Sequence, residues 1–295
     1  MKKLLAIGEA LVDIFKDEIK VGGAPLNVCS VFSKLGGESY FIGKLSNDKY
    51  GLLIKEKMKE CNIKNDYVFY DDAPTGKAFV TTLENGDREF RFERDYCVDQ
   101  LLDEKEIKEE WFKDAFALHF CSVSLDDYPS KKAHYKAIEY ARKNNCLVSF
   151  DLNLRLSLFK ELTRLKEVIF EFIEYADIIK LSYDELVWLN KKNRINDLLK
   201  GNVKIIILTL GEEGAICYLK DKRVIRVLGN KVKAIDTTGA GDAFVGAFLY
   251  CLSNDFDYEK MEEYLSFANK YSAISVTKLG AIDSYPTLNE MKRII

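Results

Sequence analysis

The chain of 295 residues contains only two histidines, His119 and His134, and both fall in patterns that are otherwise typical of a strand and a helix. A serine-hydrolase triad and an HExxH metalloprotease site both require histidine, so these enzyme classes are disfavoured. The seven cysteines are odd in number and widely spaced, and none of them forms a CxxC pair. This usage is typical of free thiols, so we expect a cytoplasmic protein without a disulfide framework or a zinc site.

Long hydrophobic runs are also missing. No apolar stretch approaches the ~18 residues that a membrane span requires. Glu9 and Asp13 interrupt the apolar start of the chain, and no small-residue cleavage site follows, so we interpret this start as a first strand and not as a signal peptide. The net charge is −3, from 44 basic and 47 acidic residues, whereas nucleic-acid binding requires a basic surplus. We therefore expect no membrane and no nucleic acid as a partner.

Short β-rich apolar runs alternate with helical patterns along most of the chain. In 161–176, Leu165, Ile169 and Phe172 belong to a stripe with the 3.6-residue spacing of a helix that buries one face. Similar stripes predict helices over 133–141 and 243–252, and strands are predicted at 4–7, 117–121, 147–150, 178–181, 205–210 and 215–219. The alternation predicts an α/β fold with a three-layer, Rossmann-like, mainly parallel sheet and helices on both faces, as a single domain over 1–295.

Residues 77–94 interrupt this alternation. Asn85-Gly86 favours a hairpin turn, because a type I′ turn needs positive φ at both central residues. Phe90 and Phe92 alternate with charged residues, as in a strand with two unlike faces. Since a hairpin does not fit a parallel central sheet, we expect a small β-sheet lid over the ligand end, formed by segments near 12–21 and 66–98. The alternative is an edge appendage without a role.

The most informative motif is DTTGAGD at 236–242, which an amphipathic helix pattern follows directly. The small residues Gly239, Ala240 and Gly241 allow a tight turn that brings N–H groups close to a ligand, and the start of a helix attracts anions. Asp242 is then either an acidic residue that favours the helix dipole or a general base that removes the proton of an attacking hydroxyl. Phosphoryl transfer needs little machinery beyond positioning and charge stabilisation.

The stretch DTTGAGDAFVGA resembles the C-terminal signature of the ribokinase-like (PfkB) carbohydrate kinases. The stretch GGAPLNV at 22–28, followed by Leu35-Gly36-Gly37 and Gly43, resembles the other signature of that family, and the two occur in the expected order. The resemblance extends over nearly the whole chain. It implies a kinase that moves the γ-phosphoryl of ATP onto a small sugar, with Asp242 as the base and the 239–241 turn as the anion site.

Several residues are candidates for binding the sugar. Gly22 and Gly23 permit close approach of the backbone to a polyol, and Asn27 offers both donors and acceptors to hydroxyls. The alternative is a tight turn with an incidental asparagine. Asp13 matches the aspartate with which the family grips its sugar, and as a carboxylate it can accept from two neighbouring hydroxyls.

A second group of candidates follows the predicted strand at 147–150. The stretch DLNLRL at 151–156 resembles the DPNLR-type segment of fructokinases, with Leu152 in place of proline. Polar groups at the C-terminal end of a parallel strand point into the ligand crevice, so Asn153 and Arg155 are expected at the substrate. Arg155 can face phosphate oxygens with its planar donor fork. The alternative is a surface loop.

The resemblance also implies ATP, magnesium (Mg²⁺) and potassium (K⁺) as cofactors. The family's N-x-x-E motif helps to hold the magnesium-water shell, and this chain has Ser182 in place of the asparagine, so only Glu185 is carried over. Ser182-x-x-Glu185 is equally typical of a helix capping box. Thr209 and Gly211 match the TxG beside the nucleotide. The positions that match the monovalent-cation ligands are Asp236, Thr238, Gly280 and Ser284.

The stretches GEALVDIF, GGAPLNV and DLNLRL are closest to fructokinases, so D-fructose is the expected substrate and fructose 6-phosphate the expected product. 2-Keto-3-deoxygluconate and ribose are the alternatives. Fructokinases commonly carry an Arg-x-x-Gly-Ala-Asp-like run, of which this chain keeps Arg94 and Asp99. Arg94 would bind the sugar, and it can also supply the cation that an acidic keto-sugar requires.

Two alternative functions, a regulator and a dehydrogenase, and one oligomeric state are also considered. The chain can be a catalytically inactive nucleotide- or sugar-binding regulator, although the intact Asp242 and glycine turn disfavour this. A dinucleotide dehydrogenase is disfavoured because no GxGxxG follows the first strand. An exposed hairpin with two phenylalanines suits a homodimer formed through the lid.

Overall fold

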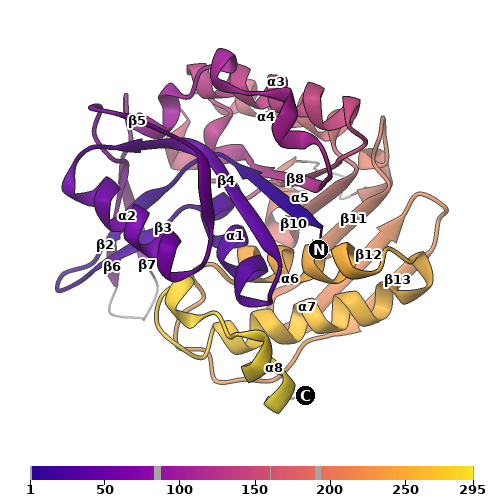
Figure 1. Ribbon diagram of the computed structural model, residues 1–295. Coiled ribbons are helices and arrows are strands. Elements are labelled where there is room, and N and C mark those ends of the chain that lie inside the picture. Colours follow the sequence, from indigo (N-terminus) through magenta and orange to yellow (C-terminus); the bar gives the residue numbers. More distant parts are fainter. Residues whose placement is uncertain (1, 83–87, 160, 190–193, 295) are drawn as a thin grey trace.

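The centre of the fold is a nine-stranded sheet (Figure 1), seen in a computed structural model that describes residues 2–82, 88–159, 161–189 and 194–294. Its strands are β1 (Lys3–Ile7), β4 (Glu38–Ser46), β5 (Lys64–Asp71), β8 (Ala115–Cys121), β9 (Leu147–Asp151), β10 (Ile178–Ser182), β11 (Ile205–Thr209), β12 (Gly214–Leu219) and β13 (Val224–Leu228). Their spatial order is β13-β12-β11-β10-β9-β8-β1-β4-β5. At one edge, β12 pairs antiparallel with both β11 and β13; the other strand pairs of this described sheet are parallel.

Helices cover both faces of this sheet (Figure 1). One face carries α1 (Ala24–Lys34), α2 (Lys49–Glu60), α6 (Ala240–Asn254), α7 (Met261–Ser275) and α8 (Leu288–Ile294), and the other carries α3 (Pro129–Lys143), α4 (Leu162–Tyr175) and α5 (Tyr183–Leu189). Side chains alternate along a strand, so Leu4 and Ala6 of β1 enter the first hydrophobic core while Leu5 and Ile7 enter the second. The predicted three-layer α/β architecture is confirmed.

The strand order reverses beside β1. From β1 the chain moves outward to β4 and β5, then returns to β8 on the other side of β1 and continues to β9, β10 and β11. In open parallel sheets the crevice beyond the carboxyl ends of the strands, at such a reversal, is where ligands bind. The segments that follow β1 and β8 are therefore expected to border the site.

Helices α1 and α6 pack side by side although they lie far apart in the sequence. Gly246 in the middle of α6 makes this possible, because a Cβ atom there would lie 2.6 Å from Cβ of Val31 in α1. The close approach brings the first turns of both helices to the same end of the sheet. These turns carry Asn27 and Asp242.

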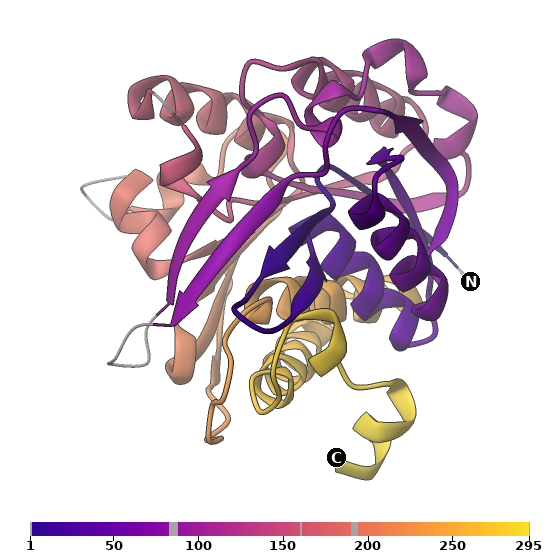
Figure 2. The same cartoon turned by 90° about the vertical axis from the view of Figure 1, so that its left-hand side faces the viewer.

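A separate four-stranded sheet, here called the small sheet, stands beside the large one (Figure 2). Its strands are β2 (Leu11–Ile14), β3 (Ile19–Gly22), β6 (Lys77–Thr82) and β7 (Arg88–Glu93), in the order β3-β2-β6-β7. The register pairs Asp13 with Ala78, and Ala78 with Phe92, so these three residues share one face.

The strands of the small sheet come from the two segments assigned to the lid from the sequence, near 12–21 and 66–98. Residues 66–71 are different: they belong to β5, which pairs with β4 over Gly43 to Ser46 at the edge of the large sheet. The main chain of β4 offers a free edge there, and parallel pairing satisfies it. The turn predicted at Asn85-Gly86 lies outside the described residues.

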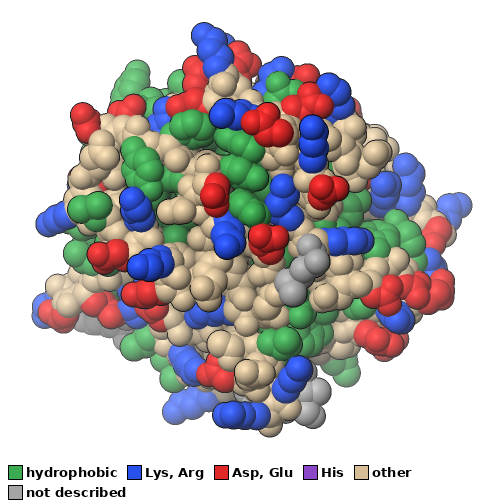
Figure 3. All heavy atoms as spheres, in the orientation of Figure 1, with side chains coloured by type: hydrophobic (Ala, Val, Ile, Leu, Met, Phe, Trp, Pro, Cys, Tyr) green, Lys and Arg blue, Asp and Glu red, His purple; other side chains and the backbone are tan. Residues whose placement is uncertain are grey.

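The surface of the described chain is mixed in charge on the face shown in Figure 3, where lysine and arginine side chains are interspersed with aspartate and glutamate. None of the helices in the described ranges combines the length and the apolar character that a membrane crossing requires.

Candidate active site

A cavity of about 800 Å³ lies where the strand order reverses, between the large sheet and the small sheet. The small sheet contributes Leu11, Asp13 and Phe92 to its wall, and the first turn of α1 contributes Asn27. The opposite wall is the segment 234–242, which ends in the first turn of α6. Two motifs from opposite ends of the sequence thus face the same space, together with Asn153, Arg155 and Glu185.

The turn at 239–241 requires glycine for steric reasons. Gly239 is the N-cap of α6 with φ 72°, and a Cβ atom there would lie 2.3 Å from the Tyr285 hydroxyl. That hydroxyl donates a hydrogen bond to the carbonyl oxygen of Gly239 at 3.0 Å. A Cβ atom at Gly241 would lie 2.8 Å from Nζ of Lys180. Without side chains at Gly239 and Gly241, the backbone at the start of α6 is accessible from the cavity, so its N–H groups can bind an anion.

The carboxylate of Asp242 lies in this first turn and is 7% exposed. Nδ2 of Asn27 donates to its Oδ2 at 2.8 Å. Burial raises the pKa of Asp242, and the hydrogen bond from Asn27 with the charges of Lys180 and Arg155 acts against that rise. A buried carboxylate with a raised pKa and an open cavity in front of it is suited to accept a proton.

Lys180 and Asp151 form a buried ion pair below the glycine turn. Nζ of Lys180 lies 3.1 Å from both carboxylate oxygens of Asp151. Burial raises the pKa of Asp151 to about 7. Burial works to lower the pKa of Lys180, but attraction to Asp151 and Glu185 outweighs it and raises the pKa, so the ammonium stays charged. This cation beside the anion site was missed from the sequence; a lone lysine in the apolar strand IIKLS was the available signal.

Most of the residues assigned to the sugar line this cavity or lie beside it. Gly22 leaves room for the Asp13 carboxylate, because a Cβ atom there would lie 2.9 Å from Oδ2 of Asp13. Gly23 has φ 113°, and a Cβ atom there would lie 2.4 Å from the carbonyl oxygen of Glu9. Asn153 adopts φ 38° directly after β9 and lines the cavity. Oδ1 of Asn27 is buried without a hydrogen-bond partner, so it can accept from a ligand hydroxyl.

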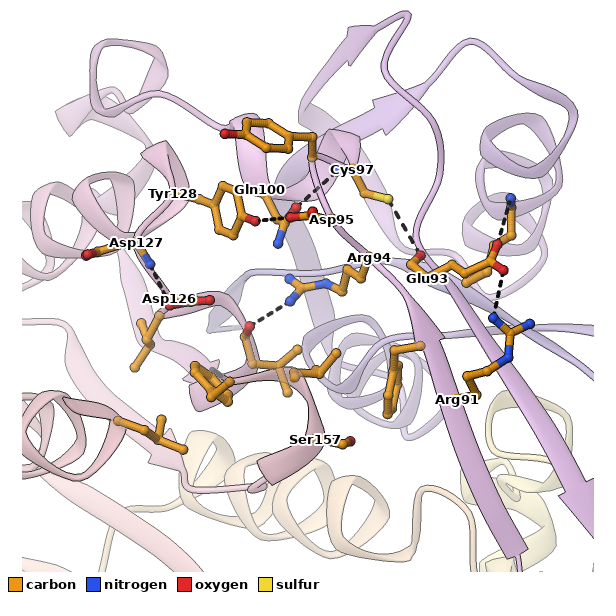
Figure 4. Close-up of a pocket in the computed structure, with 18 of the residues that line it drawn as sticks. Arg91, Glu93, Arg94, Asp95, Cys97, Gln100, Asp126, Asp127, Tyr128 and Ser157 are labelled. Atoms are coloured by element: carbon orange, nitrogen blue, oxygen red, sulfur yellow. Dashed lines mark hydrogen bonds and ion pairs between the residues drawn. The ribbon is translucent and has the colours of Figure 1, made fainter. Parts of the chain in front are cut away.

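Arg94 lies elsewhere. It belongs to a neighbouring cavity of about 1170 Å³ (Figure 4), is 6% exposed, and forms a buried salt bridge with Asp99. Nη1 of Arg94 also donates to the carbonyl oxygen of Val123 at 2.8 Å. The guanidinium is therefore compensated within the protein. Val123 and Phe92 border both cavities.

The residues assigned to metal ions have partners within the chain. Glu185 accepts from the N–H groups of Leu154 and Ser182, both at 2.7 Å, and its own N–H donates to Oγ of Ser182, which is the reciprocal capping box. Asp236 accepts from the N–H groups of Thr238 at 2.9 Å and Gly280 at 2.7 Å. This links the loop before α6 to the 280–284 segment.

Three further assigned residues lie around the cavity and do not line it. The hydroxyl of Ser284 is buried and donates to the carbonyl oxygen of Ala281 at 2.8 Å. Thr209 ends β11, and Gly211 follows it with φ 59° and open space where a Cβ atom would be. Across the described ranges, no three histidine, cysteine, aspartate or glutamate side chains form a ready metal cluster.

Comparison with known proteins agrees with this geometry. A probable chloroplastic fructokinase-6 of Arabidopsis thaliana is 41% identical over 90% of this chain and 72% of its own length. A fructokinase from Xylella fastidiosa, solved with bound ATP, superposes with a TM-score of 0.93 at 29% identity and covers 99% of this chain and 98% of its own. A fructokinase from Vibrio cholerae O395, solved with fructose, ADP and calcium, gives 0.89 at 30% identity, with coverage of 99% and 98%.

The family comparison covers almost all of the sequence. The model described as pfkB family carbohydrate kinase matches residues 2–288. Both segments that build the cavity, the glycine-rich start of α1 and the 236–242 turn, fall inside this match. The protein belongs to the pfkB family of carbohydrate kinases.

Proposed function

We propose that this kinase transfers the γ-phosphoryl group of ATP to D-fructose, giving fructose 6-phosphate and ADP, with Asp242 as the general base. The observation that carries the mechanism is the buried Asp242 carboxylate at the start of α6, hydrogen-bonded to Asn27 inside the cavity. The relatives that are themselves called fructokinases support the choice of sugar.

In this mechanism the attacking hydroxyl of the sugar lies between Asp242 and the γ-phosphorus. The hydroxyl proton passes to the Asp242 carboxylate as the new oxygen–phosphorus bond forms, and the bond to the β-phosphate oxygen breaks to release ADP. The N–H groups of the 239–242 turn and the ammonium of Lys180 stabilise the charge that gathers on the phosphoryl oxygens.

The charge of the cavity favours a neutral sugar over 2-keto-3-deoxygluconate. Arg94, the cation that an acidic sugar would need, is bound to Asp99 and lines the neighbouring cavity. Asp13, Asn27 and Asn153 on the sugar side offer hydrogen bonds suited to hydroxyl groups. Ribose remains a competing neutral sugar, which the assay below separates from fructose.

Magnesium and potassium are part of the proposal. Both oxygens of Glu185 already accept backbone N–H groups, so this carboxylate fits a magnesium ion through a water molecule, where the ion would neutralise phosphate charge. Asp236 is 3% exposed, and the N–H groups of Thr238 and Gly280 that donate to it hold two segments together whose main-chain oxygens would bind the ion. An oxygen-only donor set of this kind suits an alkali cation.

We also propose a cytoplasmic location and a homodimer formed through the small sheet. All seven cysteines are free, which supports a reducing compartment. The face of β6 and β7 opposite Asp13 carries Phe79 with Arg91 stacked on its ring at 4.3 Å, and both border the neighbouring cavity of about 1170 Å³; a second copy would cover this amphipathic surface. Light scattering tests the dimer: a single species of twice the chain mass supports it, and a monomer at micromolar concentration contradicts it.

The function is tested by a coupled ADP-release assay with MgATP and potassium, using fructose, ribose, 2-keto-3-deoxygluconate, tagatose and nucleosides. We expect the highest kcat/KM for fructose and a loss of about 10³-fold or more in Asp242→Ala. Glu262→Gln is the matched control, because it removes an acidic residue from the first turn of α7 instead of α6. Equal activity of wild type and Asp242→Ala would contradict the mechanism, and a preference for another sugar would reassign the substrate.

A further inference from the structure

A series of buried polar contacts starts at the end of the small sheet. Arg94 follows β7, and Figure 4 shows its side chain extended away from that strand. Besides its salt bridge to Asp99, Nη2 of Arg94 donates to Oγ of Ser124 at 3.3 Å. Ser124 ends the 3₁₀ turn Ser122–Ser124 that follows β8, at the reversal point of the large sheet.

The series continues to Glu9, directly after β1. Oγ of Ser124 donates to Oε2 of Glu9 at 3.0 Å, and the N–H of Ala24 donates to Oε1 at 3.0 Å. Glu9 is 2% exposed and lines the cavity. Its burial raises its pKa, and the nearby Arg94 charge acts against the rise.

Glu9 takes the place of the missing helix cap of α1. The N-cap residue of this helix is Gly23, which has no side chain and makes no side-chain cap hydrogen bond. The first N–H groups of a helix need acceptors, and a negative charge there is favourable. The carboxylate of Glu9 supplies both from the loop after β1, so the position of the first turn of α1 depends on it.

That first turn carries Asn27, the hydrogen-bond donor to Asp242. The N–H of Asn27 donates to the carbonyl oxygen of Gly23 at 2.8 Å. This carbonyl belongs to the same peptide group as the N–H of Ala24, which donates to Glu9. Oδ1 of Asn27 has no protein partner. The amide of Asn27 is thus placed by the backbone of this turn and by Asp242, and a shift of the turn changes the contact directly.

We propose that Glu9 is a positioning residue for phosphoryl transfer: it fixes the first turn of α1, and thereby the contact between Asn27 and Asp242, and Ser124 and Arg94 tie this turn to the end of the small sheet. The inference rests on the proposed role of Asp242 as the base. It assigns Glu9 no contact with the reacting atoms.

The test is a double-mutant cycle of Glu9→Gln and Asn27→Ala, measured as kcat and as KM for the sugar and for ATP. In Glu9→Gln the new side-chain amide has a single accepting oxygen for the three donors that the carboxylate binds, which are the N–H of Ala24, the hydroxyl of Ser124 and the thiol of Cys121. We therefore expect kcat to fall about 30-fold with the KM for ATP unchanged. In the Asn27→Ala background the same change should cost less than about 3-fold, because the contact that Glu9 positions is already absent.

The control is Asp177→Asn, which alters another buried carboxylate at the opposite end of the sheet, where Asp177 binds Arg142 and Lys204. It should lower stability and leave kcat unchanged. Equal losses from Glu9→Gln in both Asn27 backgrounds, or a higher sugar KM at unchanged kcat, would overturn the proposal. If Glu9→Gln does not fold, Ser124→Ala replaces it, with an expected loss of about 5-fold and the same non-additivity; full activity of Ser124→Ala would then refute the link.

A crystal structure of the Glu9→Gln variant gives a readout that does not depend on turnover. We expect the distance between Nδ2 of Asn27 and Oδ2 of Asp242 to exceed the native 2.8 Å. An unchanged distance contradicts the positioning role whether or not the enzyme is active. Absence of activity in the wild type, by contrast, would count against the proposed function alone.

Discussion

Asn27 and Asp242 are separated by 215 residues in the sequence, yet Nδ2 of Asn27 donates a hydrogen bond to Oδ2 of Asp242 at 2.8 Å. The contact joins the two glycine-rich segments at the starts of α1 and α6. It also favours the ionised form of the carboxylate and acts against the rise in pKa caused by burial, because an amide donor stabilises the negative charge. The proton-accepting state of the base therefore depends on a residue from the sugar side of the cavity.

The first prediction concerns the pH dependence of Asn27→Ala. Loss of the amide donor removes a stabiliser of the ionised carboxylate, so the pKa of Asp242 rises further above its ordinary value. Since the base acts in its ionised form, the acid limb of the pH profile of kcat/KM should move to higher pH. Other charged groups near Asp242 are Lys180, Arg155, Glu185 and Asp151. An acid limb at the wild-type position would contradict the prediction.

The second prediction separates stability from activity in the Lys180–Asp151 pair. Lys180→Met leaves the buried Asp151 carboxylate without its counter-charge, which should cost about 3–5 kcal/mol of stability. The double variant Lys180→Met/Asp151→Leu should regain most of that stability. Both variants should have low activity, because both lack the ammonium of Lys180 beside the proposed anion site. We expect kcat to fall about 10²-fold in each. Urea denaturation and the ADP-release assay check the two parts.

The third prediction uses two glycines that differ in their surroundings. Gly239 and Gly36 both have positive φ, but a Cβ atom at Gly36 meets nothing within 4 Å, whereas one at Gly239 lies 2.3 Å from the Tyr285 hydroxyl. Gly36→Ala should cost about 1 kcal/mol of stability and leave kcat unchanged. Gly239→Ala should cost more and also abolish most activity, since the start of α6 must move. Equal effects of the two changes would show that backbone strain alone is responsible.

The fourth prediction concerns acid stability through His134. This histidine is buried in α3, its Nδ1 bonds the carbonyl oxygen of Ser130, and burial lowers its pKa to about 4 from 6.5. The unfolded chain therefore binds a proton below pH 6.5 that the folded chain does not, so this group destabilises the fold progressively as the pH falls from 6.5 to about 4. Compared with His134→Gln, the wild type should lose about 1–2 kcal/mol of its relative stability between pH 7 and pH 5. A constant difference in unfolding free energy across this range would refute it.

Local sequence patterns predicted the parts of the fold that depend on local physics. The period of Leu165, Ile169 and Phe172 indicated α4, and the buried runs at 178–181 and 205–210 indicated β10 and β11. Residues 66–71 of β5 were assigned to the lid because the sequence KNDYVFYD does not show with which sheet the strand pairs. Its side chains are exposed or half-buried. Only the free edge of β4 decides that question.

In the candidate site, too, local motifs were recognisable from the sequence and contacts between separate segments were not. Glycine-rich turns at helix starts carry their own signal, so Gly23, Asn27 and Asp242 were predictable. The compensation of Arg94 by Asp99 depends on how the end of β7 packs against the turn after β8. The capping of α1 by Glu9 depends on how the loop after β1 packs against the start of that helix. No local pattern reports either contact.

Most of the cavity wall comes from two regions that are far apart in the sequence. The small sheet and the start of α1 come from residues before 156 and the start of α6 from residues after 235, while Lys180 and Glu185 of the cavity wall lie between these regions. Strands β10 to β13 also lie between these regions and belong to the nine-stranded sheet. We therefore expect that exchanging the first region for that of a relative with another sugar would change the preferred acceptor, whereas the start of α6 would be kept.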